Sequence, residues 1–154
     1  MFVGLAQRYP RARFCVDDHK VINVLQEKLK ILHVEDDRDV QEIARIALQL
    51  SDRFELLQCL SPTEALDVAA DYHADILLLD VMMPEMTGDT LLVKLRELPE
   101  YASTPAIFMT ARAHDGEIAA LKDAGGIAVI VKPFDPLTLG DLILSAVNAE
   151  AGRA

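Results

Sequence analysis

The stretch Asp75-Ile76-Leu77-Leu78-Leu79-Asp80-Val81-Met82-Met83-Pro84 contains a short apolar run that ends on an acid. A run of this kind, bounded by polar residues and proline, is typical of a buried β-strand. A carboxylate at the end of such a strand costs free energy unless it serves something there. Because ligands of open α/β sheets bind at the carboxyl ends of the strands, Asp80 is the first candidate for a functional residue.

Two further apolar runs end on charged residues in the same way. They are Lys30-Ile31-Leu32-His33-Val34, which leads into Glu35-Asp36-Asp37, and Ala128-Val129-Ile130-Val131, which leads into Lys132-Pro133. If the three strands are parallel, their acids and the lysine meet at one edge of a sheet. Carboxylates suit a hard divalent cation, and a lysine suits a phosphoryl anion. The sequence therefore suggests a divalent cation site beside a phosphoryl site.

Short apolar runs alternate with helical patterns from Lys30 onward, and the runs cover 30–34, 54–59, 75–79, 105–109 and 127–131. This alternation predicts right-handed βαβ units and a parallel sheet covered by helices on both faces. The polar residues within 54–59 indicate an edge strand, whereas the other runs are nearly all apolar, as covered central strands are. We therefore expect an α/β three-layer sandwich, a flavodoxin-like (βα)5 fold with strand order 2-1-3-4-5.

The predicted helices carry start and stop signals. Ser61-Pro62-Thr63-Glu64 provides an N-cap serine, a proline at the first helical position and a capping-box glutamate. Gly125-Gly126 predicts the end of the helix before the last strand. A last helix is expected over about 136–149, with a buried stripe made of Leu139, Leu142, Ile143, Ala146 and Val147.

Composition excludes several classes of protein. A chain of 154 residues with 51% apolar and 26% charged residues fits one folded domain, and its formal net charge of -10 argues against a nucleic-acid-binding surface. Cys15 and Cys59 form neither a disulfide framework nor a metal motif. No apolar run approaches the roughly 20 residues that cross a bilayer, and residues 1–6 are too short for a signal peptide. A cytoplasmic location is the expectation.

The domain organisation expected is an N-terminal extension over 1–29, a folded domain over 30–150 and a tail over 151–154. Two interpretations of the extension stay open. Either it is a loose segment, with at most a short helix over 21–29, or it is a docking or dimerisation segment.

Four features, taken in order, resemble the receiver domain of two-component response regulators across about 30–150. They are the acidic pair Glu35-Asp36, the run from Asp80 through Met-Met-Pro to Gly88, the pair Thr110-Ala111, and Lys132-Pro133-Phe134. The resemblance implies a phosphorylation switch rather than an enzyme. Its phosphoryl donor would be a histidine kinase or a histidine phosphotransfer protein, and its cofactor would be Mg²⁺.

The resemblance also implies a role for each residue. Asp80 would be the phosphoacceptor, with Thr110 and Lys132 contacting the phosphoryl group. The metal ligands would be Glu35, Asp36, Asp80 and the backbone carbonyl of Met82. Asp37 is expected to cap the next helix rather than bind metal, and the Lys132-Pro133 peptide bond is expected to be cis.

One position departs from the family pattern. Val129 stands where receivers usually carry Tyr or Phe, and a valine has no ring that could swing inward when Thr110 moves. The output would then pass through residues 112–114 and the fourth helix, or through dimer contacts. Because only 150–154 follow the last helix, we expect a stand-alone receiver whose output is protein contact and not DNA binding. It would be a monomer or a weak homodimer through the fourth helix, fifth strand and fifth helix.

Two other classes of protein are alternatives to the phosphorylation switch. A degenerate receiver would act as a phosphorylation-independent binding module, and failure to bind Mg²⁺ would favour it. An enzyme on the same fold, such as a flavodoxin or an aspartyl-phosphate hydrolase, fits poorly. The acids at 35–37 would repel a flavin phosphate, and the chain has no GxxxxGK[ST] loop.

Overall fold

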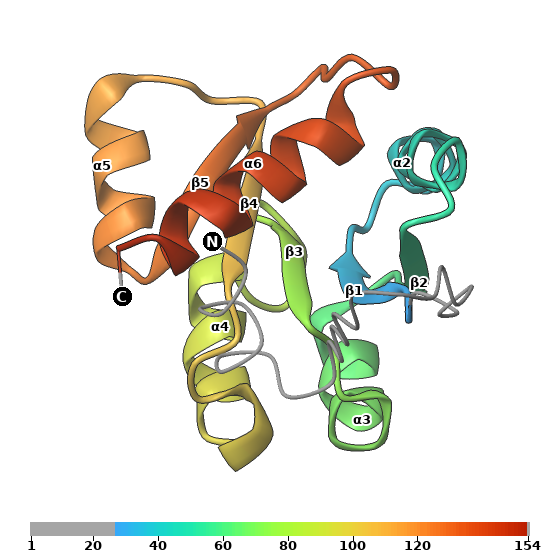
Figure 1. Cartoon of the computed structure of the whole chain (residues 1–154). Coiled ribbons are helices and arrows are strands. Elements are labelled where there is room, and N and C mark those ends of the chain that lie inside the picture. Colours follow the sequence, from blue (N-terminus) through green and yellow to red (C-terminus); the bar gives the residue numbers. More distant parts are fainter. Residues whose placement is uncertain (1–26, 154) are drawn as a thin grey trace.

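The computed structural model describes residues 27–153, so residues 1–26 of the predicted extension and Ala154 lie outside the described residues. The strands are β1 (Leu29–Val34), β2 (Phe54–Cys59), β3 (Ile76–Asp80), β4 (Ala106–Thr110) and β5 (Gly126–Val131). They pair in parallel in the order β2-β1-β3-β4-β5 (Figure 1). The predicted strand order is confirmed, and the first strand begins one residue earlier than expected.

Helices cover both faces of the sheet. They are α2 (Arg38–Gln49), α3 (Pro62–Tyr72), α4 (Gly88–Arg96), α5 (Asp115–Asp123) and α6 (Leu139–Ala151), with the 3-10 helix η1 (Pro99–Tyr101) after α4. In Figure 1, α2 and α6 lie on one face, while α3 and α4 lie on the other and α5 flanks β5. None of the helices in the described part of the chain is long and apolar enough to cross a membrane.

The two faces of the sheet carry separate hydrophobic cores. The first core packs β-strand side chains such as Leu77 and Phe108 against α3, α4 and α5. The second packs Leu78 and Met109 against α2 and α6. Neighbouring residues of one strand therefore belong to different cores, as the two-residue period of a strand requires.

Two helices begin where the sequence predicted. Asp37 is the N-cap of α2, and its carboxylate accepts hydrogen bonds from the N–H groups of Asp39 and Val40. Ser61 caps α3 through the N–H of Glu64 at 3.1 Å. The carboxylate of Glu64 accepts from the N–H of Leu60 at 2.8 Å, one residue before the partner that a capping box would give it.

Three sequence expectations need correction. The strand at 127–131 lies at the edge, where the predicted order puts it, but three of its residues are only half-buried, so its apolar run does not mark a fully covered strand. Helix α6 begins at Leu139 rather than near 136, because the carbonyl and carboxylate of Asp135 organise a turn over the residues before it. Leu142 is 48% exposed and lies outside the buried stripe, since only one narrow side of α6 faces the sheet.

The start of β5 is tightly packed against β4. Gly125 ends α5 as predicted, with φ of 112°. At Gly126, an added Cβ would lie 2.6 Å from Cδ2 of Phe108 and 3.0 Å from the carbonyl oxygen of Leu121. The ring of Phe108 therefore occupies the space that any side chain at this position would need.

Replacing Gly126 by alanine should lower the free energy of unfolding by about 1–3 kcal/mol, the usual cost of overpacking a core. Gly116→Ala is the matched control, because a Cβ at this helical position meets nothing within 4 Å. It should raise stability by up to about 1 kcal/mol through helix propensity. Urea unfolding measures both values, and equal effects of the two substitutions would contradict the crowding at Gly126.

Candidate functional site

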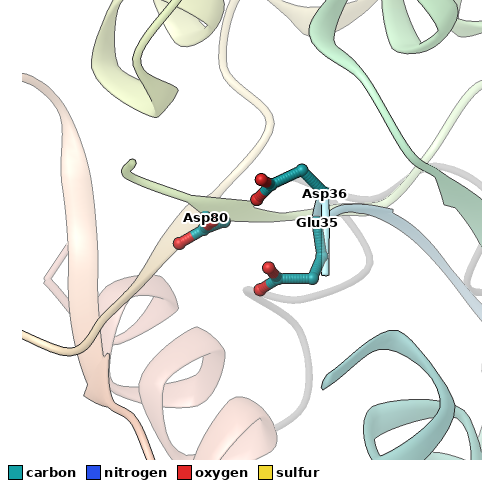
Figure 2. Close-up of side chains that lie close together, drawn as sticks. All are labelled: Glu35, Asp36 and Asp80. Atoms are coloured by element: carbon teal, nitrogen blue, oxygen red, sulfur yellow. The ribbon is translucent and has the colours of Figure 1, made fainter. Parts of the chain in front are cut away.

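The carboxyl ends of β1, β3 and β5 bring the predicted site residues together. Asp80 is the last residue of β3, Glu35 directly follows β1, and Lys132 directly follows β5. In Figure 2 the side chains of Glu35 and Asp36 leave the end of β1 in different directions, yet both carboxylates point toward Asp80. The turn of the chain after Val34 thus lets two consecutive acids serve one site.

Glu35, Asp36 and Asp80 form an acidic cluster, in which one carboxylate oxygen of each residue lies within 4.8 Å of the others. The cluster is only partly open to solvent, because Glu35 is 1% exposed and Asp80 is 3% exposed, whereas Asp36 is exposed. Two buried acids at this separation repel each other more strongly than they would in water. The cluster therefore needs positive charge beside it.

Lys132 supplies one positive charge to this cluster. Its Nζ lies 3.0 Å from Oδ1 of Asp80 and 3.1 Å from Oε2 of Glu35. The N–H of Lys132 donates to the carbonyl of Thr110 at 2.8 Å, and the Lys132-Pro133 peptide bond is cis, as the sequence predicted.

The ionisation of the site follows from burial and from these neighbours. Burial, followed by the charge of Asp80, raises the pKa of Glu35 from its usual 4.5 to about 7. Burial also raises the pKa of Asp80, although Lys132 acts in the opposite direction. Burial alone would lower the pKa of Lys132, but Asp80 and Glu35 outweigh it and the pKa is raised. The ammonium is therefore firmly charged, while Glu35 is poised to take up a proton.

Thr110 and Met82 lie at the same edge of the sheet. Thr110 ends β4, is buried, and its hydroxyl oxygen accepts a hydrogen bond from the N–H of Arg112 at 3.1 Å, which leaves its own proton available to another acceptor. Met82 lies two residues beyond Asp80, with its side chain 59% exposed. Their predicted contacts with a phosphoryl group and with a metal stay predictions.

Val129 is half-buried and packs against the first core, on the face of the sheet covered by α3, α4 and α5. Phe108 is its neighbour in the β4–β5 register. The ring on this side of the two strands therefore comes from β4.

The loop between β3 and α4 folds closely over Asp80. The N–H of Gly88 donates to the carbonyl of Val81 at 2.9 Å, and a Cβ at Gly88 would lie 2.2 Å from the carbonyl oxygen of Asp80. Glu85, in the same loop, adopts a positive φ of 75°, and its carboxylate accepts a hydrogen bond from the hydroxyl of Thr63 at 2.7 Å. Only glycine allows the backbone to approach Asp80 this closely.

Sequence reasoning missed three polar residues beside the cluster, namely His33, Gln41 and Gln58. His33 was assigned no role, although it is fully buried in β1 and burial together with Lys132 lowers its pKa to about 3. Its neighbour in the β1–β2 register is Gln58, which bonds to both His33 and α2. The sequence signal that could have found them is a polar residue inside each of two strands predicted to be neighbours, His33 in one and Gln58 in the other.

Comparison with known proteins agrees with this geometry. The sequence model of the response regulator receiver domain matches residues 31–144. The chain is 33% identical over 112 residues to response regulator Rre1 of Synechocystis, covering 73% of this chain and 48% of that protein. It is 32% identical over 113 residues to transcriptional regulatory protein YvrH of Bacillus subtilis, covering 73% and 46%. The chain thus spans about half the length of these two relatives.

A shorter relative and two solved structures match over more of their length. An uncharacterised 14.6 kDa protein of Leptolyngbya boryana is 34% identical over 116 residues, which is 75% of this chain and 88% of that protein. The chemotaxis response regulator CheY4 of Vibrio cholerae superposes with a TM-score of 0.72 at 28% identity, covering 77% of this chain and 98% of that chain. A response regulator from Desulfuromonas acetoxidans gives a TM-score of 0.70 at 28% identity, covering 79% and 98%. With the strand order and the charged strand ends in place, these matches establish that the chain belongs to the response regulator receiver domain family.

Proposed function

We propose that this protein is a phosphorylation-dependent signalling switch that accepts a phosphoryl group on Asp80. The observation that carries the proposal is the position of the Asp80 carboxylate, nearly buried at the end of β3 and held 3.0 Å from the ammonium of Lys132, with two further acids beside it. A carboxylate in this setting is a plausible nucleophile for phosphorus.

The proposed reaction is transfer from a phosphohistidine. A carboxylate oxygen of Asp80 forms a new bond to phosphorus, and the bond between phosphorus and the imidazole nitrogen breaks. The imidazole leaves with the electron pair, and Asp80 becomes an acyl phosphate. The protein would serve as acceptor in this reaction, which agrees with its class as a signalling module rather than an enzyme.

The donor atoms of the acidic cluster fit a hard divalent cation such as Mg²⁺. Three carboxylates within 4.8 Å of one another offer oxygen ligands, and the two buried ones lack enough positive charge to balance them. Glu35, Asp36, Asp80 and the backbone carbonyl of Met82 would hold the ion. When bound, Mg²⁺ offsets the repulsion between an anionic nucleophile and an anionic phosphoryl group.

Lys132 and Thr110 would contact the oxygens of the phosphoryl group. The Lys132 ammonium is a point charge on a flexible stem, so it can follow negative charge from the carboxylate to a phosphoryl oxygen. The hydroxyl of Thr110 is buried at the end of the neighbouring strand and has a proton to donate. Together they would stabilise the charge that spreads over the oxygens during transfer.

The proposal extends to partners and to location. The donor would be a histidine kinase or a histidine phosphotransfer protein, the partners that receiver domains use. The output would be contact with another protein through the surface of α5, β5 and α6. The receiver would occupy residues 30–150, and its place would be the cytoplasm.

Asp80→Asn should abolish phosphorylation and leave the fold intact, because the amide keeps the shape of the side chain and removes the nucleophile. Incubation with acetyl phosphate and Mg²⁺, followed by phosphate-affinity gel electrophoresis, measures this. We expect a shifted band for the wild type only when Mg²⁺ is present. Asp67→Asn, an exposed acid on α3, is the control and should shift like the wild type.

Two outcomes would count against the proposal. A shifted band for Asp80→Asn would refute the acceptor assignment. A folded wild type that is neither labelled nor able to bind Mg²⁺ would support the alternative, a degenerate receiver that acts as a phosphorylation-independent binding module.

Lys132→Ala should slow phosphorylation by about a hundredfold, because a charge that stabilises the transferring group is lost. Mg²⁺ binding should persist or tighten, since the ammonium and the cation face the same carboxylates. Calorimetric Mg²⁺ titration and the rate of labelling separate the two effects, with Lys122→Ala on exposed α5 as the control. Loss of Mg²⁺ binding in Lys132→Ala would show that this account of its role is wrong.

Without divalent cations, stability should fall as the pH rises from about 4.5 to 7. The pKa of Glu35 is near 4.5 when unfolded and about 7 in the fold, so the folded state holds more protons across this window. Unfolding is then favoured by raising the pH. Glu35→Gln should remove this part of the slope in urea unfolding, whereas Glu97→Gln at an exposed position should keep it. An unchanged slope in Glu35→Gln would contradict the assignment.

A further inference from the structure

A chain of polar contacts lies behind the acidic cluster and joins β1, β2 and α2. We call it the glutamine network, and its members are His33, Gln41 and Gln58. His33 and Gln58 are partners in the register of β1 and β2, and Gln41 lies in the first turns of α2. None of these residues belongs to the acidic cluster, but His33 lies in β1 two residues before Glu35, which directly follows that strand.

Gln58 holds two elements at once. Its Nε2 lies 2.8 Å from the carbonyl oxygen of Gln41 and 3.0 Å from Nδ1 of His33. An amide nitrogen only donates, so Nδ1 of His33 accepts and the ring carries its proton on Nε2. Edge strand β2 is thereby tied to the central strand β1 and to the helix that follows the acidic pair.

Gln41 completes the connection to the site. Its Nε2 donates to the carbonyl oxygen of Glu35 at 3.1 Å and to that of Cys59 at 2.8 Å. The N–H of Glu35 donates to the same carbonyl of Cys59 at 3.1 Å. Both backbone groups of Glu35 are therefore fixed, one by the end of β2 and the other by a side chain of α2.

The glutamine network contributes little to the stability of the sheet. Nε2 of His33 is buried and has no hydrogen-bond partner among the residues that the structure describes. Such an atom destabilises the fold, and replacing both members of a buried polar pair by apolar groups is often neutral or stabilising. The fold alone would be served at least as well by two apolar residues at this register position.

We propose that Gln41 and Gln58 are positioning residues for the acidic cluster. Gln41 fixes the backbone carbonyl of Glu35, and Gln58 holds the backbone of Gln41 in place. The carboxylate of Glu35 then faces Asp80 and Lys132, and the cluster is arranged for a divalent cation before the cation arrives. This inference rests on the proposed function, because it names residues that tune the cation site of the same switch. Partners that orient ligands in this way commonly contribute a large part of a metal site's affinity.

Gln41→Met and Gln58→Met test the proposal, since methionine keeps the length of the side chain and removes the donor. Calorimetric titration with Mg²⁺ alone should give a Kd raised about tenfold in each variant. Gln49→Met is the control, because Gln49 lies on the same helix but accepts its hydrogen bond from Arg45 on the exposed face. Its Kd should equal that of the wild type. A wild-type Kd in Gln41→Met would overturn the proposal.

A double variant separates positioning from a merely structural role. His33→Val combined with Gln58→Val replaces the polar pair by an apolar one, and thermal unfolding should show equal or higher stability. The Kd for Mg²⁺ should still rise. If stability is kept and the Kd is unchanged, the polar pair contributes neither to the fold nor to the cation site, and the proposal is overturned.

The two proposals fail in different ways. A wild type that binds Mg²⁺ and is phosphorylated, beside glutamine variants that do the same with unchanged Kd, refutes the network and leaves the switch standing. A folded wild type that neither binds Mg²⁺ nor is phosphorylated refutes the switch, and with it the proposal that the network positions a cation site.

Discussion

The ammonium of Lys132 is the contact on which the functional edge of the sheet depends. It reaches from the end of β5 to Glu35, directly after β1, at 3.1 Å and to Asp80, the last residue of β3, at 3.0 Å. Without a cation at this point, two nearly buried carboxylates would face each other in a medium that screens charge poorly. The ion pair also joins the far edge strand to the middle of the sheet. The ends of β1, β3 and β5 are thereby held close together at this edge of the sheet.

The sequence predicted which charged residues meet at one edge of the sheet, because its signals are local. Each strand is a short apolar run, and Glu35, Asp80 and Lys132 end or directly follow such a run, so that parallel pairing alone brings them to one edge. The helix starts at Asp37 and Ser61 were equally predictable, because a cap depends on residues only two or three positions away. The edge position of the second strand followed from the polar residues within it.

Other features depend on distant neighbours and could not be predicted in this way. The contact of Gln58 with His33 needs the exact register of two strands, and the reach of Gln41 needs the orientation of α2 over the end of β2. Leu142 has the same hydrophobicity as its buried neighbours, and only the angle at which α6 meets the sheet leaves it exposed. The apolar composition of β5 suggests a strand covered on both faces. Three of its residues are nevertheless half-buried, because β5 lies at the edge of the sheet.

The division of the interior into two cores bears on how such a protein can evolve. Leu77 and Phe108 pack on one side of the sheet, and Leu78 and Met109 on the other, with the hydrogen-bonded backbone between them. Substitutions that share no side-chain contact combine nearly additively in their effects on stability. The sheet thus keeps the stability effects of mutations in one core nearly independent of those in the other. Substitutions in the core under α3, α4 and α5 can therefore accumulate while the packing of α2 and α6 against the other face stays nearly unchanged.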